Sequence, residues 1–394
     1  MYLKNAKIAT GDTMEFLLRD GKIFALGTDL SAAALPEEET LDAAGKTILP
    51  AFIDLHCHWR TPGFEYKEDL ATGSAAAAAG GYTYVNLMPN TKPVCSGAAQ
   101  ALEIQMKVEE IGLCSANQTV SITQNFDGTT LDHLKSLPSG VKFITEDGHG
   151  IQSADVMARA FAIAQQKGIT IMSHAEVSDI SPWDYRLAED LETVRNLYLA
   201  EYYGTALHMC HVSTRGAIEA ITAAKWRGVP VTCEASPHHL CFNTEDLDTR
   251  VNPPIRTADD CEALLDGIRS GAVDAIATDH APHSEEDKLA GSPGMVGLET
   301  AFGLCYTKLC KNDGISLAQL STLMSTNPAA ILGLNKGALA PGFDADVVLV
   351  DLDTPYVVDK NALHSKSKNC PFDGIALFGK ACTTIKGGKV TYQA

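Results

Sequence analysis

The middle of the chain alternates short apolar or β-branched runs with longer helical patterns, and this alternation constrains the fold more than any other feature. The helical patterns are EDLATGSAAAAAGG, SGAAQALEIQMKVEEIG, SADVMARAFAIAQQKG, DLETVRNLYLAEYYG from Asp190, STRGAIEAITAAKWRG and TADDCEALLDGIRSG. Several of them open with Ser, Thr or Asp and close with Gly, as capped helices do. The strand candidates between them are 51–56, 82–87, 117–123, 140–145, 169–173, 206–210, 229–234 and 274–278. Eight βα units predict an α/β fold of the closed (β/α)₈ TIM type, with an open doubly wound sheet as the weaker alternative.

The two ends of the chain have a different pattern. YLKNAKIATG, MEFLLRDGKIFALG, ADVVLVDLD and GKACTTIKGGKVTYQ are typical of short strands, and DGK and GGK are typical of the tight turns between them. We therefore expect a barrel domain over residues 51–340. Residues 1–50 together with 341–394 should form a small β-sandwich that carries no catalytic residue.

The composition is that of an ordinary globular protein. Hydrophobic residues make up 45% and charged residues 20% of the 394 residues, which is enough to build a sizeable core. No secretory signal pattern and no apolar run of about 18 residues is present, so we expect neither export nor a membrane span. The 11 cysteines are scattered without a CxxC pair, which indicates reduced thiols in the cytoplasm.

The net charge limits the partners. Lys and Arg number 31 against 49 Asp and Glu, a balance of −18, so the protein repels phosphate backbones and anionic lipids. We expect no nucleic-acid partner and no membrane partner. An anionic substrate would need a local group of cationic side chains to overcome this field.

Metal-binding side chains recur where the predicted barrel strands end. Residues two apart on a strand point to the same side, so His56 and His58 can chelate one ion. The other candidates at strand ends are Asp147 in TED, His174, His211 and Asp279. Imidazoles with carboxylates suit zinc and other first-row divalent ions, and the lack of clustered cysteines favours a catalytic over a structural site. Cys57 points to the opposite strand face and is expected to pack in the core.

Several motifs resemble one known family. The segment DLHCHWRTPGFEYKEDLATG resembles the opening of the cyclic amidohydrolases, and LMPNTKP and TDHAPH narrow the resemblance to the dihydroorotase family, of the type associated with aspartate transcarbamoylase. SHAE, HVST, NPPIR, GMVGLET and SKSKNCPFDG follow in the same order. The resemblance implies a zinc-dependent hydrolase that interconverts dihydroorotate and N-carbamoyl-L-aspartate by a metal-activated hydroxide, in pyrimidine biosynthesis.

The resemblance also implies a ligand set for one or two Zn²⁺ ions. His56, His58 and Asp279 would bind one ion, His174 and His211 would bind a second, and Asp147 would bridge the two. Many relatives use a carboxylated lysine as the bridge, so Lys142 stays an alternative to Asp147. Asp279 would be the catalytic residue, taking a proton from the hydroxide and returning it to the leaving ring nitrogen.

The resemblance further implies contacts to the substrate. Arg60 projects to the same face as His58, and its guanidinium fork matches a carboxylate. Asn90 and His283 would bind the same carboxylate, with His58 beside it. The pyrimidine ring would meet Asn252 and the backbone at Pro293 and Gly294, on the 284–294 loop, which is short for the family.

Some features stay open at this stage. His238 and His239 favour a supporting role, His208 favours burial within its strand, and Trp59 would affect substrate preference if it reached the pocket. A hydantoinase or allantoinase activity is one alternative, although Arg60 and Asn90 argue against it. A non-catalytic scaffold for aspartate transcarbamoylase is another. A homodimer and a complex with that enzyme are both compatible with the sequence.

Overall fold

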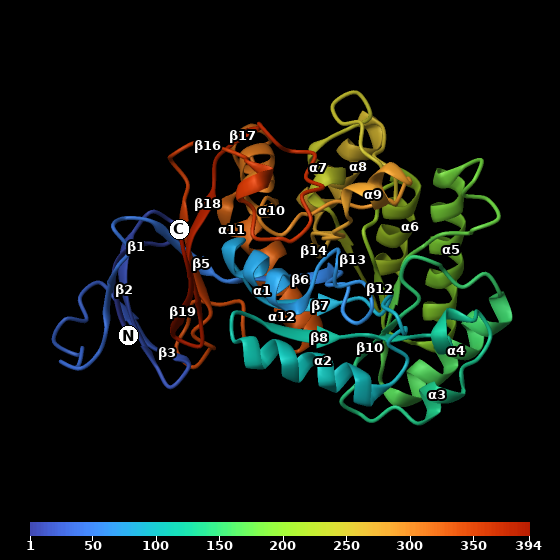
Figure 1. Ribbon diagram of the computed structural model, residues 1–394, viewed down its shortest axis with the longest axis horizontal. Helices are drawn as coiled ribbons and strands as arrows, with labels where there is room; N and C mark the ends of the chain where they lie inside the picture. Colours follow the sequence, from blue (N-terminus) through green and yellow to red (C-terminus); the bar gives the residue numbers. More distant parts are fainter.

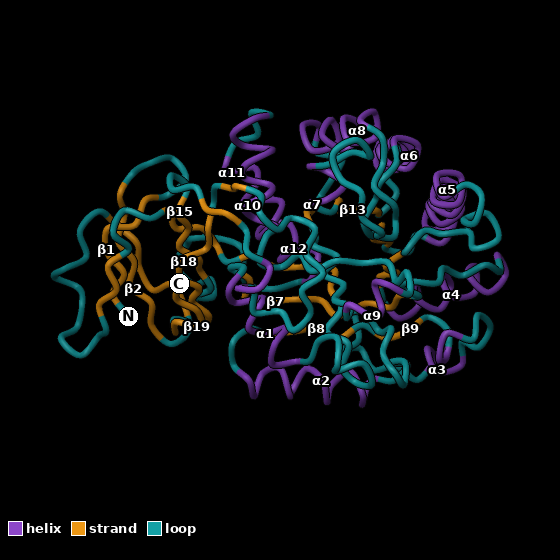
Figure 2. The backbone as a smooth tube through the Cα atoms, turned by 45° about the horizontal axis from the view of Figure 1, so that its top comes forward, coloured by secondary structure: helices purple, strands orange, loops and turns teal.

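The computed structural model describes residues 1–394 and shows two parts lying side by side. A barrel surrounded by helices forms the larger part, and a sheet that carries both chain termini forms the smaller part (Figure 1). In Figure 2 the barrel strands lie at the centre and the helices lie outside them. The predicted α/β barrel with a separate sheet from both ends is thus confirmed.

All eight predicted barrel strands are present and pair in parallel. They are β6 (Phe52–Cys57), β7 (Tyr82–Leu87), β8 (Ser115–Gln118) with β9 (Val120–Ser121), β10 (Phe143–Thr145), β11 (Thr170–Ser173), β12 (Leu207–Met209), β13 (Val231–Ala235) and β14 (Ala275–Ile276). The third strand is divided at Thr119, because β8 pairs with β7 and β9 pairs with β10. A parallel bridge between Cys57 and His280 closes the ring.

The six predicted helices cover the barrel. They are α1 (Leu70–Ala79), α2 (Ala98–Ile111), α4 (Ala154–Lys167), α5 (Tyr185–Tyr203), α6 (Arg215–Trp226) and α8 (Ala258–Ser270). Ser153 caps α4 by accepting from the Val156 amide, and Gly168 ends it at a φ of 64°. Helix α5 begins at Tyr185, earlier than the pattern from Asp190 predicted, because Asp184 caps its first turn.

Shorter helical segments lie in the connections. The α-helices are α3 (Asp132–Lys135), α7 (Pro237–Cys241), α9 (Glu285–Leu289), α10 (Ala301–Cys305), α11 (Leu317–Ser321) and α12 (Asn327–Leu332). Segments of other helical type are η1 (Gln124–Phe126), η2 (Tyr306–Asn312), η3 (Thr322–Thr326) and η4 (Lys360–Ala362). None of the helices combines the length and the apolar character needed to span a membrane.

The terminal strands form one eight-stranded sheet in the order β19-β18-β15-β5-β1-β2-β3, with β4 paired to β1. These strands are β1 (Tyr2–Lys7), β2 (Thr13–Arg19), β3 (Lys22–Gly27), β4 (Thr40–Asp42), β5 (Thr47–Pro50), β15 (Val347–Asp351), β18 (Lys380–Lys386) and β19 (Lys389–Gln393). A separate pair, β16 (Tyr356–Val357) and β17 (Ala376–Leu377), lies between them in sequence. The sheet encloses its own core of Leu3, Phe16, Ile23, Val347 and Ile385, among others. The exact division into 51–340 and 1–50 plus 341–394 stays a prediction.

Strand β15 joins the two parts. Val347 and Leu349 belong to the core of the terminal sheet, whereas Val348 and Val350 belong to the core of the barrel. Successive side chains of a strand point to opposite faces, so one strand contributes to both cores. The sheet is therefore packed on the barrel.

Phe52 tests the packing at the start of β6. Its ring is fully buried, 4.7 Å from the ring of Phe302 and 5.5 Å from that of Tyr82. We expect Phe52→Ala to lower the free energy of unfolding by about 3–5 kcal/mol through the cavity it leaves. Phe24→Ala, at a position 57% exposed, should change it by less than ~1 kcal/mol. Urea denaturation followed by circular dichroism measures both, and equal losses would contradict the packing described.

Candidate metal centre and active site

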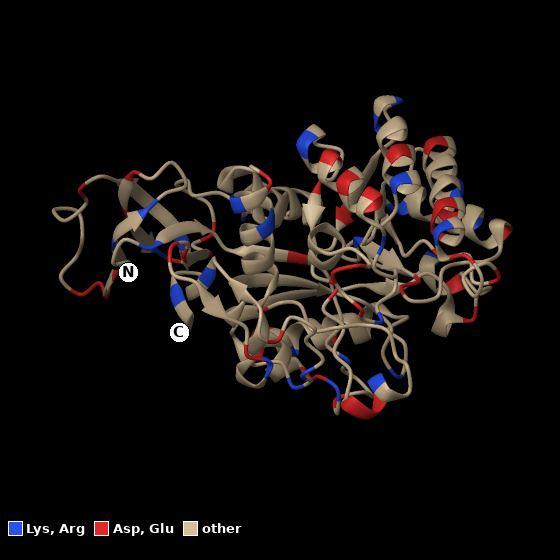
Figure 3. Ribbon diagram, turned by 90° about the horizontal axis from the view of Figure 1, so that it is seen from above, with Lys and Arg blue, Asp and Glu red and all other residues tan.

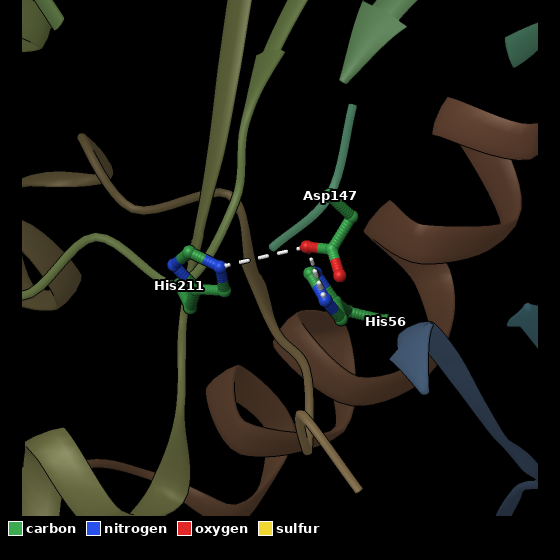
Figure 4. A group of neighbouring side chains, drawn as sticks. All are labelled: His56, Asp147 and His211. Atoms are coloured by element: carbon green, nitrogen blue, oxygen red, sulfur yellow. Dashed lines mark ion pairs between the residues drawn. The ribbon is translucent and has the colours of Figure 1, made fainter. Parts of the chain in front are cut away.

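The carboxyl ends of the barrel strands bring six metal-binding side chains together, all of them buried. His56 and His58 come from the end of β6. Asp147, His174 and His211 follow β10, β11 and β12, and Asp279 follows β14. They are His56, His58, Asp147, His174, His211 and Asp279, and Figure 4 shows three of them. The structure thus places all six predicted ligands in one cluster.

Asp147 lies at the centre of this cluster. Its Oδ1 is 3.2 Å from His56 Nε2, 3.6 Å from His174 Nδ1 and 3.9 Å from His211 Nε2, and its Oδ2 is 3.6 Å from His58 Nε2. Figure 4 shows the carboxylate between His56 and His211. One carboxylate therefore stands between two pairs of histidines, which is the arrangement required of a bridging ligand.

The first histidine pair has a second carboxylate. Asp279 Oδ1 lies 3.2 Å from His58 Nε2 and 3.6 Å from His56 Nε2. These three side chains form one potential metal group, and His56, Asp147 and His211 form another, each with ligand atoms within 4.8 Å of one another. His56 Nε2 and Asp147 Oδ1 are buried without a hydrogen-bond partner. Such unpartnered buried atoms and an imidazole–carboxylate donor set fit a divalent metal ion.

The electrostatics of the cluster follow from its pairing. Burial raises the pKa of Asp147, but the neighbouring histidines, His56 foremost, outweigh it and hold the pKa well below its usual range. Burial lowers the pKa of His174, but Asp147 and Glu176 outweigh it and raise the pKa to about 10. Without a metal His174 therefore holds a proton near neutral pH, and metal binding there displaces it.

Buried carboxylates behind the cluster fix the orientation of two histidines. Glu234 on β13 has Oε1 3.1 Å from His56 Nδ1 and Oε2 2.9 Å from His208 Nε2, and all three side chains are fully buried. Glu176 Oε2 lies 3.0 Å from His174 Nε2. An ionised carboxylate only accepts, so Nδ1 of His56 carries its proton and Nε2 faces the cluster.

Neither carboxylate was identified from the sequence. A carboxylate inside the apolar strand VTCEA and one beside His174 in SHAE were the available signals. The predicted burial of His208 is confirmed, and its burial is explained by the contact to Glu234.

Asn90 has a role beyond the predicted one. Its Oδ1 accepts from His58 Nδ1 at 2.9 Å, and its Nδ2 donates to Asp147 Oδ2 at 3.1 Å. Asn90 therefore orients one histidine and the central carboxylate. Its Nδ2 carries a second hydrogen, which leaves one donor for a ligand.

The cluster opens into a pocket with a cavity volume of about 170 Å³. The backbone is strained at its rim, since Arg60, His211 and Asp279 have positive φ values of 54°, 33° and 47°. The lining residues are His58, Arg60, Asn90, Asp147, His174, His211, Asn252, Asp279, Ala281, His283, Pro293 and Gly294. All residues that the sequence predicted to contact substrate line this pocket, and His56 lies beneath it.

One side of the pocket is cationic. Arg60 donates from Nε to the Pro282 carbonyl at 3.1 Å, and its Nη2 lies 3.2 Å from His283 Nε2. Lys67 Nζ lies 3.3 Å from His283 Nδ1. Burial lowers the pKa of Arg60 to about 10, and burial, Arg60 and Lys67 lower the pKa of His283 to about 3, so near neutral pH the arginine is charged and the histidine neutral.

Lys67 was missed in the sequence, although EYKED stands close after the HxH pair. With Arg60 it supplies the local cationic group that an anionic substrate needs on a protein of net charge −18, whose acidic and basic residues are spread over both parts of the molecule (Figure 3). Because Lys67 also lies 3.3 Å from Asp287, it connects the segment after β6 with α9.

Several candidates lie outside the cluster. Lys142 is exposed at the amino end of β10, the opposite end from Asp147. Trp59 is buried against Gly73 of α1 and does not line the pocket. It therefore does not reach the pocket, which was the condition for an effect on substrate preference. Glu146 turns away and accepts from the Thr123 amide at 2.8 Å.

The remaining histidines do not line the pocket. His238 and His239 are buried at the start of α7, and His239 Nε2 lies 3.0 Å from the Pro253 carbonyl. His133, His149 and His364 also lie away from the cluster. Cys57 is buried and its Sγ faces the Asn86 carbonyl, which confirms its packing role; all 11 cysteines are free.

Comparisons with known proteins agree with this site. The model of the amidohydrolase family matches residues 47–391. A solved L-hydantoinase (dihydropyrimidinase) from Arthrobacter aurescens has a TM-score of 0.88 at 26% identity, with 99% of this chain and 95% of that one covered. The chain therefore belongs to the amidohydrolase family, a family of metal-dependent hydrolases.

Two relatives that cover nearly the whole chain are named dihydroorotase. A dihydroorotase from Clostridium botulinum (strain Eklund 17B / Type B) is 46% identical, covering 100% of this chain and 99% of its own. A dihydroorotase from Geobacter metallireducens is 40% identical, covering 97% of this chain and 96% of its own. The resemblance stated from the motifs is confirmed over the full length.

Glu234 provides a test of the metal centre. Glu234→Gln removes the charge that holds His56, so we expect divalent-metal affinity to fall about 10–100-fold while the fold persists. Competition with a chelator measures the affinity. Glu189→Gln is the control, because Glu189 is also buried but pairs with Arg256 at 3.0 Å instead of a cluster histidine. Equal affinity in the two variants would show that Glu234 does not support the metal.

Proposed function

We propose that this protein is a dihydroorotase, which reversibly hydrolyses the cyclic amide of dihydroorotate to N-carbamoyl-L-aspartate in de novo pyrimidine biosynthesis. The observation that carries the proposal is the cationic side of the pocket, Arg60 with His283, facing the Asp279 side of the metal cluster. A substrate with a ring carboxylate and a cyclic amide matches both sides. The dihydroorotase relatives at 46% and 40% identity support it.

The metal in this proposal is zinc, with one or two ions. His56, His58 and Asp279 would hold one ion, His174 and His211 the other, and Asp147 would bridge them, in preference to the distant Lys142. When bound, a divalent metal lowers the pKa of a coordinated water and polarises the scissile carbonyl.

Asp279 is the proposed proton carrier. Burial raises the pKa of its carboxyl, but His58 and His56 outweigh it and hold the pKa below the usual range, so the group is ionised at rest. An ionised carboxylate in the pocket wall can accept a proton from the attacking water and then return it to the leaving ring nitrogen. Its strained backbone, with a φ of 47°, holds it in that wall.

The substrate carboxylate would bind between Arg60 and His283. Arg60 and Lys67 can only donate hydrogen bonds, and a neutral imidazole between them has one acceptor nitrogen. His283 can therefore accept from only one of them, and the guanidinium of Arg60 keeps N–H donors for which a substrate carboxylate supplies acceptors. Asn90 and His58 would complete this side.

The pyrimidine ring would be held on the opposite wall. Asn252 donates from Nδ2 to Glu176 Oε2 at 2.8 Å, which fixes the side chain and leaves its carbonyl oxygen for a ring N–H. The backbone at Pro293 and Gly294 would provide the remaining contacts.

Two alternatives are weaker. A hydantoinase or allantoinase activity would explain the similarity to the solved L-hydantoinase, but those substrates lack the ring carboxylate that Arg60 would bind. A non-catalytic scaffold for aspartate transcarbamoylase would not require six gathered metal ligands.

We place the protein in the cytoplasm, in keeping with its free cysteines. The oligomeric state is a separate question. Sedimentation of the protein alone and mixed with aspartate transcarbamoylase distinguishes a homodimer from a complex of the two proteins.

The direct test is ring opening of dihydroorotate by the purified protein, run beside hydantoin and allantoin with metal content measured on the same sample. We expect turnover of dihydroorotate only, loss of turnover on chelation, and recovery with Zn²⁺. Turnover of hydantoin instead would replace the proposed substrate, and a protein that binds no metal would overturn the centre itself.

Arg60→Met tests the substrate side separately. Losing a charged bidentate contact should raise KM for dihydroorotate by roughly 10–100-fold, with a smaller change in kcat. Steady-state kinetics measures the split, and metal content should stay unchanged because Arg60 contacts no ligand atom of the cluster. Asp279→Ala serves as the inactive reference. An unchanged KM in Arg60→Met would exclude Arg60 from carboxylate binding.

A further inference from the structure

The motif SKSKNCPFDG has no role in the site described above. Its first part lies in a segment without helix or strand, residues 363–370, which we call the brace. Ser365 and Ser367 are buried and Asn369 is half-buried, whereas Lys366 and Lys368 are exposed. Burial thus alternates along the brace, and its three short polar side chains face inward.

The brace binds the loop that follows β6. Ser365 Oγ donates to Glu68, a fully buried carboxylate, and the Lys366 amide donates to Glu68 Oε1 at 3.0 Å. Ser367 Oγ donates to the Lys67 carbonyl at 2.6 Å. The same loop, residues 60–69, begins with Arg60.

The brace also binds the loop that follows β14. Asn369 Oδ1 accepts from the His283 amide at 3.2 Å, and Nδ2 lies 3.3 Å from the Ala281 carbonyl and 3.2 Å from the Gly294 carbonyl. The Asn369 carbonyl accepts from the Val296 amide at 3.2 Å. One side chain thus joins the two ends of the 281–294 loop.

These two loops carry the cationic side of the pocket, yet no residue of the brace lines the pocket. Arg60 comes from one loop, and His283 and Gly294 come from the other. Their separation is therefore set by a segment of the chain end that we expected to be remote from catalysis. The metal ligands, by contrast, have no hydrogen bond to the brace.

We propose that the brace fixes the spacing between Arg60 and the His283–Gly294 loop, and that Asn369 is its central positioning residue. This inference rests on the proposed function, because it concerns the side that binds the substrate carboxylate. The brace acts on substrate affinity and leaves the metal centre unchanged.

The chemistry of the position requires an amide. Asn369 accepts one hydrogen bond and donates two, which a side-chain amide can do and a carboxylate cannot. An aspartate of the same shape would keep the bond from His283 but set its second oxygen against the carbonyls of Ala281 and Gly294. Unpaired buried carbonyls and their repulsion would open the loop.

The test compares Asn369→Asp with Asn327→Asp. Asn327 is also half-buried and donates to a backbone carbonyl, that of Asp274 at 2.8 Å, but at the amino end of β14, away from the pocket. We expect Asn369→Asp to raise KM for dihydroorotate about tenfold, with kcat and metal content close to those of the wild type. Asn327→Asp should leave KM unchanged. Equal KM values in the two variants would overturn the proposal.

Ser367→Ala removes a single bond to the Lys67 carbonyl and covers the case in which Asn369→Asp fails to fold. Its KM should rise less than tenfold, and hydrogen exchange should increase in peptides of 60–69. In Asn369→Asp the increase should fall in peptides of 280–296. Unchanged exchange in both loops would refute the brace.

The wild-type assay separates the two proposals. If the wild-type protein does not open dihydroorotate, the proposed function fails, and the exchange measurement alone decides whether the brace holds the loops. If the wild-type protein is active and the variants match it in KM and exchange, only the brace fails.

Discussion

The carboxylate of Asp147 lies in the interior of the barrel, where the imidazoles of four histidines surround it. Burying a charge is costly unless it is paired, and each partner must itself be held in place. The protein meets this requirement with a second layer of side chains: Glu234 holds His56, Glu176 holds His174, and Asn90 holds His58. Each of these comes from a different strand or loop, so the cluster exists only in the closed barrel.

The barrel supplies the geometry through the direction of its strands. Parallel strands end on one face, and the chain turns sharply there, as the positive φ values of His211 and Asp279 show. Asp54 strengthens the closure, because Oδ1 accepts from the Thr278 amide at 2.9 Å and ties β6 to the end of β14. Burial raises the pKa of Asp54 to about 7, the effect expected of a carboxyl placed in the wall for structural reasons.

Strand periodicity, capped helices and the spacing of His56 and His58 depend on neighbours within a few residues, and these predictions hold. The convergence of the six metal-binding side chains was predicted from their places at the strand ends and from the resemblance. The distant pairings that support the site were not predictable: Glu234 meets His56 across 178 positions, and Asn369 meets His283 across 86. The start of α5 was predicted too late in the chain, because the hydrophobic pattern does not mark the cap at Asp184.

Different parts of the fold hold the two sides of the pocket in place, and this difference affects which side can change among members of the family. The metal side is built from strand ends and buried carboxylates, so a change there disturbs paired charges in the barrel wall. The cationic side is built from Arg60, His283 and Lys67 on two loops joined by the brace, and loops tolerate substitution better than strands do. The fold is shared with an L-hydantoinase at 26% identity, as expected where the strand framework persists and the loops on the substrate side are free to change.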